Sequence, residues 1–201
     1  LVILGLKVAL KQNRISQDIY DDYIKRMLKS SDNIPLIAEK AQEWYQNNKQ
    51  DFLKCRRLYI IGYENCISAM LEGTLKISES VRYSTQCYEL EEFMHGIYHC
   101  IDQDTYMFYL GSGGQYFNRA IQLKRYFEEE RNAHCFLISN ENNNKKDFYF
   151  PFTNDKDFTV MEYVVPLQVF ARSCSADLGI DANIPSDPDF HKKMQSYIYD
   201  K

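Results

Sequence analysis

Three features are missing from this 201-residue sequence: a long hydrophobic run, a block of basic residues and a pair of cysteines at CxxC spacing. The apolar opening LVILGLKVALK is interrupted by Lys7 and has no cleavage site of small residues, so it predicts neither a membrane span nor a signal peptide. The net charge of −4 comes without a basic run that could follow a phosphate backbone. We therefore expect no nucleic-acid partner and no membrane partner.

The six cysteines are scattered through the predicted helices and strands. They are Cys55, Cys66, Cys87, Cys100, Cys135 and Cys174. This scatter favours reduced, buried thiols over a disulfide framework or a zinc site, and it predicts a cytoplasmic location. Apolar residues make up 45% and charged residues 26% of the chain, a balance that is typical of globular domains and excludes disorder and fibres.

Short apolar runs that end at or beside Gly or Ser indicate parallel strands buried on both faces. They lie at 57–63 (RLYIIGY), 105–111 (TYMFYLG) and 134–139 (HCFLIS), with 148–152 (FYFPF) as a fourth. Amphipathic helical patterns follow at 66–82, 115–132 and 158–178. Strands alternating with helices predict right-handed crossovers. The expected fold class is therefore α/β, a three-layer α-β-α sandwich with a mainly parallel sheet.

Two details of the helices can also be predicted. Residues 1–50 should form several helices separated by the polar clusters SSDN (30–33) and NNKQD (47–51). In the helix at 66–82, apolar spacing predicts an inner face made of Ile67, Met70, Leu71, Leu75, Ser78 and Val81.

Sites in sheets of this kind lie beyond the carboxyl ends of the strands. Gly62, Gly111 and Ser139 mark three of those ends. The GSGG turn (111–114) could either cradle an anion at the start of the next helix or form a plain tight turn.

The helix at 66–82 carries Glu72, Lys76 and Glu79 in one row, because positions three and four residues apart share a face. The row is either a solvated face with two surface ion pairs or part of a catalytic site. In the catalytic interpretation, a carboxylate kept ionised by the ammonium acts as general base, and His95 protonates an oxygen or a leaving amine. Otherwise His95 is a core or interface imidazole. His95 and His99 have the spacing of a metal pair, but no third ligand is evident, so we expect no metal.

The segment 71–96 resembles a known family. LEGTLKISE (71–79), with the HG pair of His95 and Gly96 beginning sixteen residues after Glu79, is similar to the LEGALKLKE motif and HG pair of the second sugar isomerase (SIS) module of double-SIS proteins. That family includes the isomerase half of glutamine-fructose-6-phosphate transaminase and the fructosamine 6-phosphate deglycases. RLYIIGY and VVPLQVFARSCSADLGID (164–181) are similar to further segments of the module, so the resemblance covers nearly the whole chain. It implies the flavodoxin-like SIS fold.

The resemblance also implies a division of the chain. Residues 1–50 would be a helical lead-in, made of the end of a preceding SIS module and a linker helix; residues 51–180 would be the SIS module; residues 181–201 would be a C-terminal tail that reaches the active site. Leu1 in place of Met, inside a helical pattern, predicts upstream sequence. The preceding module would supply the main phosphate clamp, so we expect this chain alone to be inactive.

For the site, the resemblance implies a catalytic Glu79, a supporting Lys76, and a His95 that enters the neighbouring subunit's site in a homodimer. The candidates for substrate binding are Glu72, Gly62 and two tail lysines, Lys192 and Lys193, one of which would cap the sugar. No cofactor is implied.

The implied reaction moves a proton between C1 and C2 of an amino-sugar or fructosamine 6-phosphate. HGI in place of the family's HGP, together with the tail DPDFHKKMQSYIYDK, favours a fructosamine 6-phosphate deglycase. Two alternatives stay open: the isomerase part of a glutamine-fructose-6-phosphate transaminase, and a non-catalytic sugar-phosphate sensor.

Overall fold

The computed structural model describes residues 1–141 and 144–196. Its centre is a parallel sheet built from the predicted apolar runs. The strands are β1 (Arg57–Gly62), β2 (Ser84–Glu89), β3 (Tyr106–Gly111), β4 (His134–Ser139) and the two-residue β5 (Phe148–Tyr149). They pair in the order β2-β1-β3-β4-β5, and every pairing is parallel. The predicted α/β class is confirmed.

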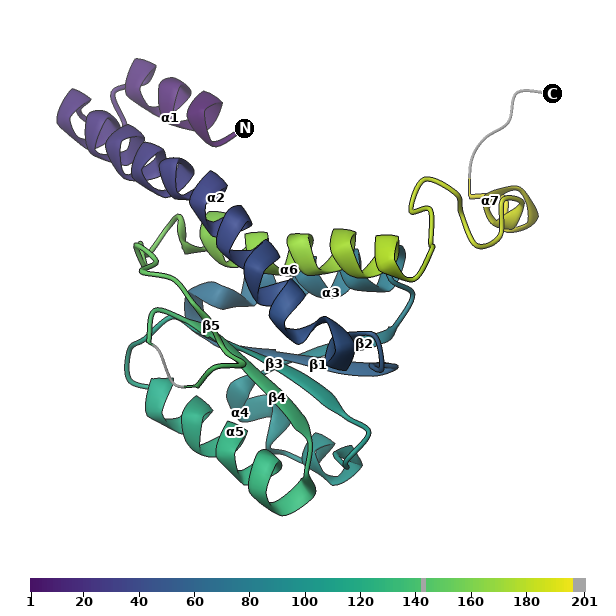
Figure 1. The fold of residues 1–201 in the computed structure, drawn as a ribbon. Helices are drawn as coiled ribbons and strands as arrows, with labels where there is room; N and C mark the ends of the chain where they lie inside the picture. The colour runs from purple at the N-terminus through teal and green to yellow at the C-terminus, as the bar shows by residue number, and fades with distance from the viewer. Residues whose placement is uncertain (142–143, 197–201) are drawn as a thin grey trace.

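Helices cover both faces of the sheet (Figure 1). One face carries α2 (Gln17–Phe52), α3 (Ile67–Ser80) and α6 (Thr159–Asp177); the other carries α4 (Leu90–Phe93) and α5 (Phe117–Arg131). Within β1, Leu58 and Ile60 face the first group, whereas Tyr59 and Ile61 face the second. This alternation is the two-residue period of a strand, and burial on both faces explains why the run is apolar throughout.

The sequence pattern did not reveal β2. This strand forms the edge of the sheet, where it pairs with β1 alone, and its residues STQCYE are exposed or half-buried. A polar edge strand has neither an apolar run nor a clean alternation.

The predicted breaks in the N-terminal helices are wrong, because α2 runs unbroken through SSDN, Pro35 and NNKQD. Tertiary partners satisfy the polar side chains that suggested a loop. Ser30 bonds to Thr153 (3.1 Å), and the Asn33 amide donates to Glu162 (2.7 Å). Asn48 donates to the Lys146 carbonyl (3.3 Å). Polar residues in a helix need not end it when their hydrogen bonds are made elsewhere.

The predicted inner face of α3 is partly wrong. Leu71 and Leu75 are 55% and 50% exposed, whereas the buried residues of α3 are Ala69, Met70, Gly73 and Ile77. Small residues are buried here because α3 packs closely against α6, where Leu167 lies on Gly73. The contact stripe is therefore rotated away from the leucines.

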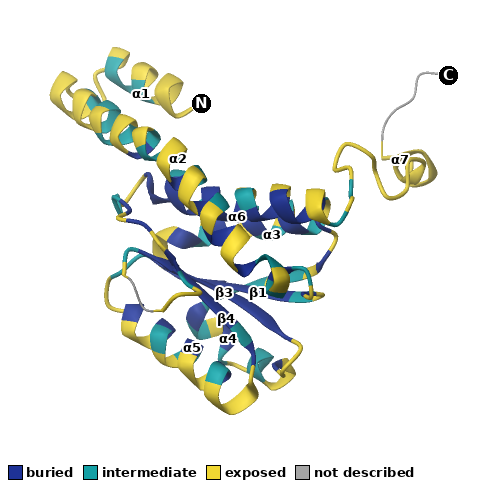
Figure 2. Ribbon diagram, viewed as in Figure 1, coloured by how far each residue is buried: buried dark blue, intermediate teal, exposed yellow. Residues whose placement is uncertain are grey.

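Both ends of the described chain are exposed. Helix α1 (Val2–Lys11) has no buried residue, and it projects beyond the sheet together with the first turns of α2 (Figures 1 and 2). Residues 181–196, including the short α7 (Phe190–Lys193), contain only exposed positions. Within residues 1–141 and 144–196, no helix has the length and apolar character needed to cross a membrane.

Candidate active site

The row predicted on α3 exists. The Lys76 ammonium donates to Glu79 Oε2 at 2.9 Å and lies 3.9 Å from Glu72 Oε1. The pKa of Lys76 is raised above its ordinary value. The main cause is the hydrogen bond to Glu79, and the negative charge of the same carboxylate is the second cause. The side chains are between 38% and 53% exposed, so the ion pairs contribute little to stability. The three side chains are therefore accessible to a ligand.

Glu79 lines a groove of about 490 Å³ between the end of α3 and the C-terminal tail. The α3 side of the groove consists of Ser78, Glu79 and Arg82. The tail side consists of Ala182, Ile184, Pro185, Ser186, Asp187, Pro188, Phe190 and His191. Arg82 Nη2 donates to the Ile184 carbonyl at 2.7 Å, which joins the two sides. Among the residues near Glu79, sequence reasoning missed Arg82 and Asp187, and no local pattern marks either of them.

The groove lies at the opposite edge of the sheet from the one expected. Helix α3 leaves the carboxyl end of β1 and returns to the start of β2, so its last turn, with Glu79, lies near the amino edge. Gly62 lies beside Met70, which is nine residues before Glu79 and so about 14 Å from it along α3. Gly62 is buried, and a Cβ there would meet Met70 at 3.4 Å. The structure therefore does not bring Gly62 together with Glu79.

The structure does not bring His95 and Glu79 of one chain together. It follows α4, which begins at the carboxyl end of β2, and α4 packs into the cluster on the α5 face through Leu90 and Phe93. Glu79 precedes β2 on the other face. The two side chains therefore come from helical segments that cover opposite faces of the sheet. His95 is exposed, and Gly96 has φ +143°, a conformation suited to glycine, with open space around it.

The tail lysines lie in α7, beyond the groove. Lys193 Nζ bonds both carboxylate oxygens of Asp187, at 3.2 and 3.1 Å, and Asp187 lines the groove. Lys192 is exposed in α7. The part of the predicted tail from residue 197 to 201 is outside the described residues.

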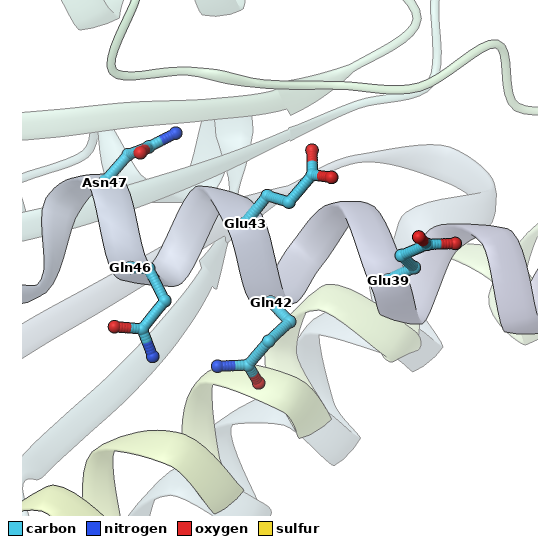
Figure 3. Close-up of a pocket in the computed structure, with 5 residues that line it drawn as sticks. All are labelled: Glu39, Gln42, Glu43, Gln46 and Asn47. Atoms are coloured by element: carbon cyan, nitrogen blue, oxygen red, sulfur yellow. The ribbon is translucent and has the colours of Figure 1, made fainter.

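Two other hollows contain none of the predicted site residues. A groove of about 670 Å³ on α2 is lined by Glu39, Gln42, Glu43, Gln46 and Asn47. Figure 3 shows these side chains leaving the helix in different directions, as on a solvated face. A hollow of about 220 Å³ lies at the carboxyl edge, between the starts of α3 and α6, and contains none of the predicted site residues. Within the described residues, no three His, Cys, Asp or Glu side chains are grouped to hold a metal.

Comparison with known proteins supports the fold. No protein-family model matches the chain. A candidate phosphosugar isomerase from Clostridium difficile 630 superposes with a TM-score of 0.89 at 26% identity, covering 95% of this chain and 54% of that one. A candidate sugar-binding protein from Salmonella typhimurium LT2 gives a TM-score of 0.79 at 29% identity, covering 86% of this chain and 53% of that one.

In sequence, the chain is 22% identical over 191 residues to the isomerizing glutamine–fructose-6-phosphate aminotransferase of Caldanaerobacter subterraneus subsp. tengcongensis, covering 92% of this chain and 31% of that protein. The chain thus spans about half the length of the matched structures and a third of the curated relative. Its structural neighbours include phosphosugar isomerases, and the SIS resemblance predicted from the sequence is confirmed.

Proposed function

We propose that the protein containing this chain is a phosphosugar enzyme of the SIS type, which moves a proton between C1 and C2 of an amino-sugar or fructosamine 6-phosphate. One observation carries the proposal: the Glu79 carboxylate, bonded to Lys76 at 2.9 Å, lines an open groove of about 490 Å³. A carboxylate in reach of a carbon next to a carbonyl is the general base that this proton transfer needs.

The side chains divide the chemistry as follows. Glu79 removes the proton from one carbon and returns it to the other. Lys76 orients the carboxylate through its hydrogen bond, and it can relay a hydroxyl proton. His95 assists ring opening or departure of the amine, and it comes from a second copy of the chain, because the sheet separates it from Glu79 in its own chain. A homodimer with shared active sites follows from this assignment.

The favoured substrate is a fructosamine 6-phosphate, which makes the enzyme a deglycase. HGI in place of HGP at residues 95–97 and the tail sequence support this choice. The second candidate is the isomerase part of a transaminase, which the 22% identity to the aminotransferase over 92% of the chain supports. A sugar-phosphate sensor without catalysis is the third; the ion-paired Glu79 argues against it, since binding alone needs no base.

Solvent hydrogen exchange tests the proposal directly. The full-length protein is incubated in D₂O with a fructosamine 6-phosphate or with fructose 6-phosphate, and deuterium at C1 and C2 is followed by NMR together with amine release. Deuterium incorporation with amine release identifies a deglycase, and amino transfer that depends on glutamine identifies a transaminase. If the protein binds these sugar phosphates tightly but none of them takes up deuterium, the enzymatic proposal is overturned and the sensor is the function that remains.

A further inference from the structure

The end of α3 has an unusual residue in a left-handed conformation. Arg82 has φ +63°, and its N–H donates to the Ile77 carbonyl at 3.1 Å, which ends the helix. Helices that end this way usually place Gly or Asn at such a position, because a side chain with Cβ is strained there. For the backbone conformation alone, glycine is the more favourable residue at position 82. The role of an arginine there must therefore depend on its side chain.

The Arg82 side chain reaches a distant part of the chain. Its Nη2 donates to the Ile184 carbonyl at 2.7 Å, a contact between residues 102 positions apart. Both residues line the groove that contains Glu79. The guanidinium thus ties the tail wall of the groove to the helix that carries the candidate base, three residues from it.

Packing does little to hold this tail in place. Every described position from 181 to 196 is exposed, so burial of apolar side chains cannot fix the tail on the body of the protein. Pro185 and Pro188 restrict the backbone between Ile184 and α7. Because that stretch is stiff, the anchor at Ile184 orients the part of the groove wall that follows it, including Asp187 and the Lys193 paired with it.

We propose that Arg82 is a positioning residue, which holds the C-terminal tail as one wall of the Glu79 groove and so sets how tightly the substrate is held. This inference rests on the proposed function for its kinetic part. Its structural part, the anchoring of the tail, does not depend on the reaction.

The test compares Arg82→Gly, Arg82→Lys and a matched control, Asn132→Gly, in the full-length protein. Asn132 ends α5 with φ +54°, so both glycine variants remove a side chain from a left-handed backbone position at a helix end. Only Arg82→Gly also removes a guanidinium. Arg82→Gly should keep or raise the melting temperature, while trypsin cleavage after Lys192 and Lys193, followed by mass spectrometry, becomes several-fold faster. Arg82→Lys and Asn132→Gly should retain slow cleavage.

Kinetics give the second readout. With a substrate that the wild type turns over, Arg82→Gly should lower kcat/KM by about 10- to 100-fold, mainly through KM, and Arg82→Lys should restore most of it. Unchanged tail cleavage in Arg82→Gly would overturn the anchoring. Faster cleavage with unchanged KM and kcat would overturn the positioning role. A wild type that turns over no sugar phosphate would refute the proposed function, and the cleavage assay would still decide whether Arg82 anchors the tail.

Discussion

Gly73 of α3 lies directly against Leu167 of α6. A Cβ built on Gly73 would overlap Leu167 Cδ1 and lie 3.0 Å from Leu167 Cβ, and Leu167 is fully buried. The contact joins LEGTLKISE to VVPLQ, two of the segments on which the family resemblance depends. It also sets the rotation of α3, because the face with Gly73 is buried and the row with Glu72, Lys76 and Glu79 is turned toward solvent and the tail.

Replacing Gly73 with alanine should therefore destabilise the protein. The added methyl group has no space between α3 and α6, so the free energy of unfolding should fall by about 1–3 kcal/mol, as for overpacking in other cores. Urea unfolding measures the change.

Gly5 provides the matched control, because it also lies within a helix but has nothing within 4 Å of its Cβ position. Gly5→Ala should leave stability unchanged or raise it by up to about 1 kcal/mol. Equal stability of Gly73→Ala and wild type would show that α3 and α6 can move apart at little cost.

Glu79→Gln should abolish most of the proposed activity without affecting the fold. The amide keeps the shape and can still bond to Lys76, but it cannot accept the substrate proton, so kcat should fall by about 10²- to 10⁴-fold. Because the Glu79 side chain is 53% exposed, the melting temperature should stay the same. Deuterium exchange at C1 and C2 measures the loss.

Glu43→Gln is the control, since Glu43 accepts from Lys40 at 2.9 Å in the same i,i+3 geometry but does not line the groove. It should leave activity unchanged. If Glu79→Gln exchanged deuterium at the wild-type rate, another residue would have to be the base.

Mixing two inactive variants can show which subunit supplies His95. If each site combines Glu79 of one copy with His95 of the other, a heterodimer of Glu79→Gln and His95→Ala has one site with both residues intact. Random assembly from equal amounts should then restore about a quarter of wild-type activity. Coexpression with two affinity tags isolates the heterodimer.

The alternative gives a clear contrast. If His95 acted on Glu79 of its own chain, every site in the heterodimer would carry one defect, and no activity would return. Each homodimer, assayed alone, provides the background rate.

The ion pairs of Arg26 should make the free energy of unfolding decrease at acid pH. Its guanidinium bonds both oxygens of Asp155 at 2.7 Å and Asp157 at 2.5 Å, which connects α2 to the start of α6. These bonds from Arg26 lower the pKa of Asp155 below its usual range. A carboxylate with a lowered folded-state pKa stabilises the protein above about pH 4, the unfolded value, and this stabilisation is lost as pH falls through the folded value.

We therefore expect Arg26→Gln to reduce the free energy of unfolding by about 1–2 kcal/mol at pH 7. The difference from wild type should shrink below about pH 4, as Asp155 takes up its proton in the wild type. Urea titrations from pH 7 to pH 2 measure both. Lys40→Gln, which breaks an exposed pair with Glu43 within α2, should cause no measurable change at any pH. A difference that stayed constant down to pH 2 would contradict the role of Asp155.

The central strands could be predicted because their evidence is local. After the half-buried Arg57 and His134 that begin β1 and β4, the strands β1, β3 and β4 are apolar since both faces are covered, and each ends at Gly or Ser. β2 could not be recognised in this way, because an edge strand buries little and its pairing with β1 is a tertiary contact. For the same reason, the polar residues of α2 suggested loops: Thr153 and Glu162, which satisfy Ser30 and Asn33, are more than 120 positions away.

The sequence by itself determined the α/β class, the alternation of strands and helices, and the row of Glu72, Lys76 and Glu79. Periodicity along single segments is enough to specify these features. Tertiary structure alone decided which face of α3 is buried, that Glu79 lies near the amino edge of the sheet rather than beside Gly62, and that Arg82 and Asp187 line the same groove as Glu79. These outcomes depend on contacts such as Gly73 with Leu167 and Arg82 with Ile184, which join residues about a hundred positions apart and leave no periodic trace in either segment.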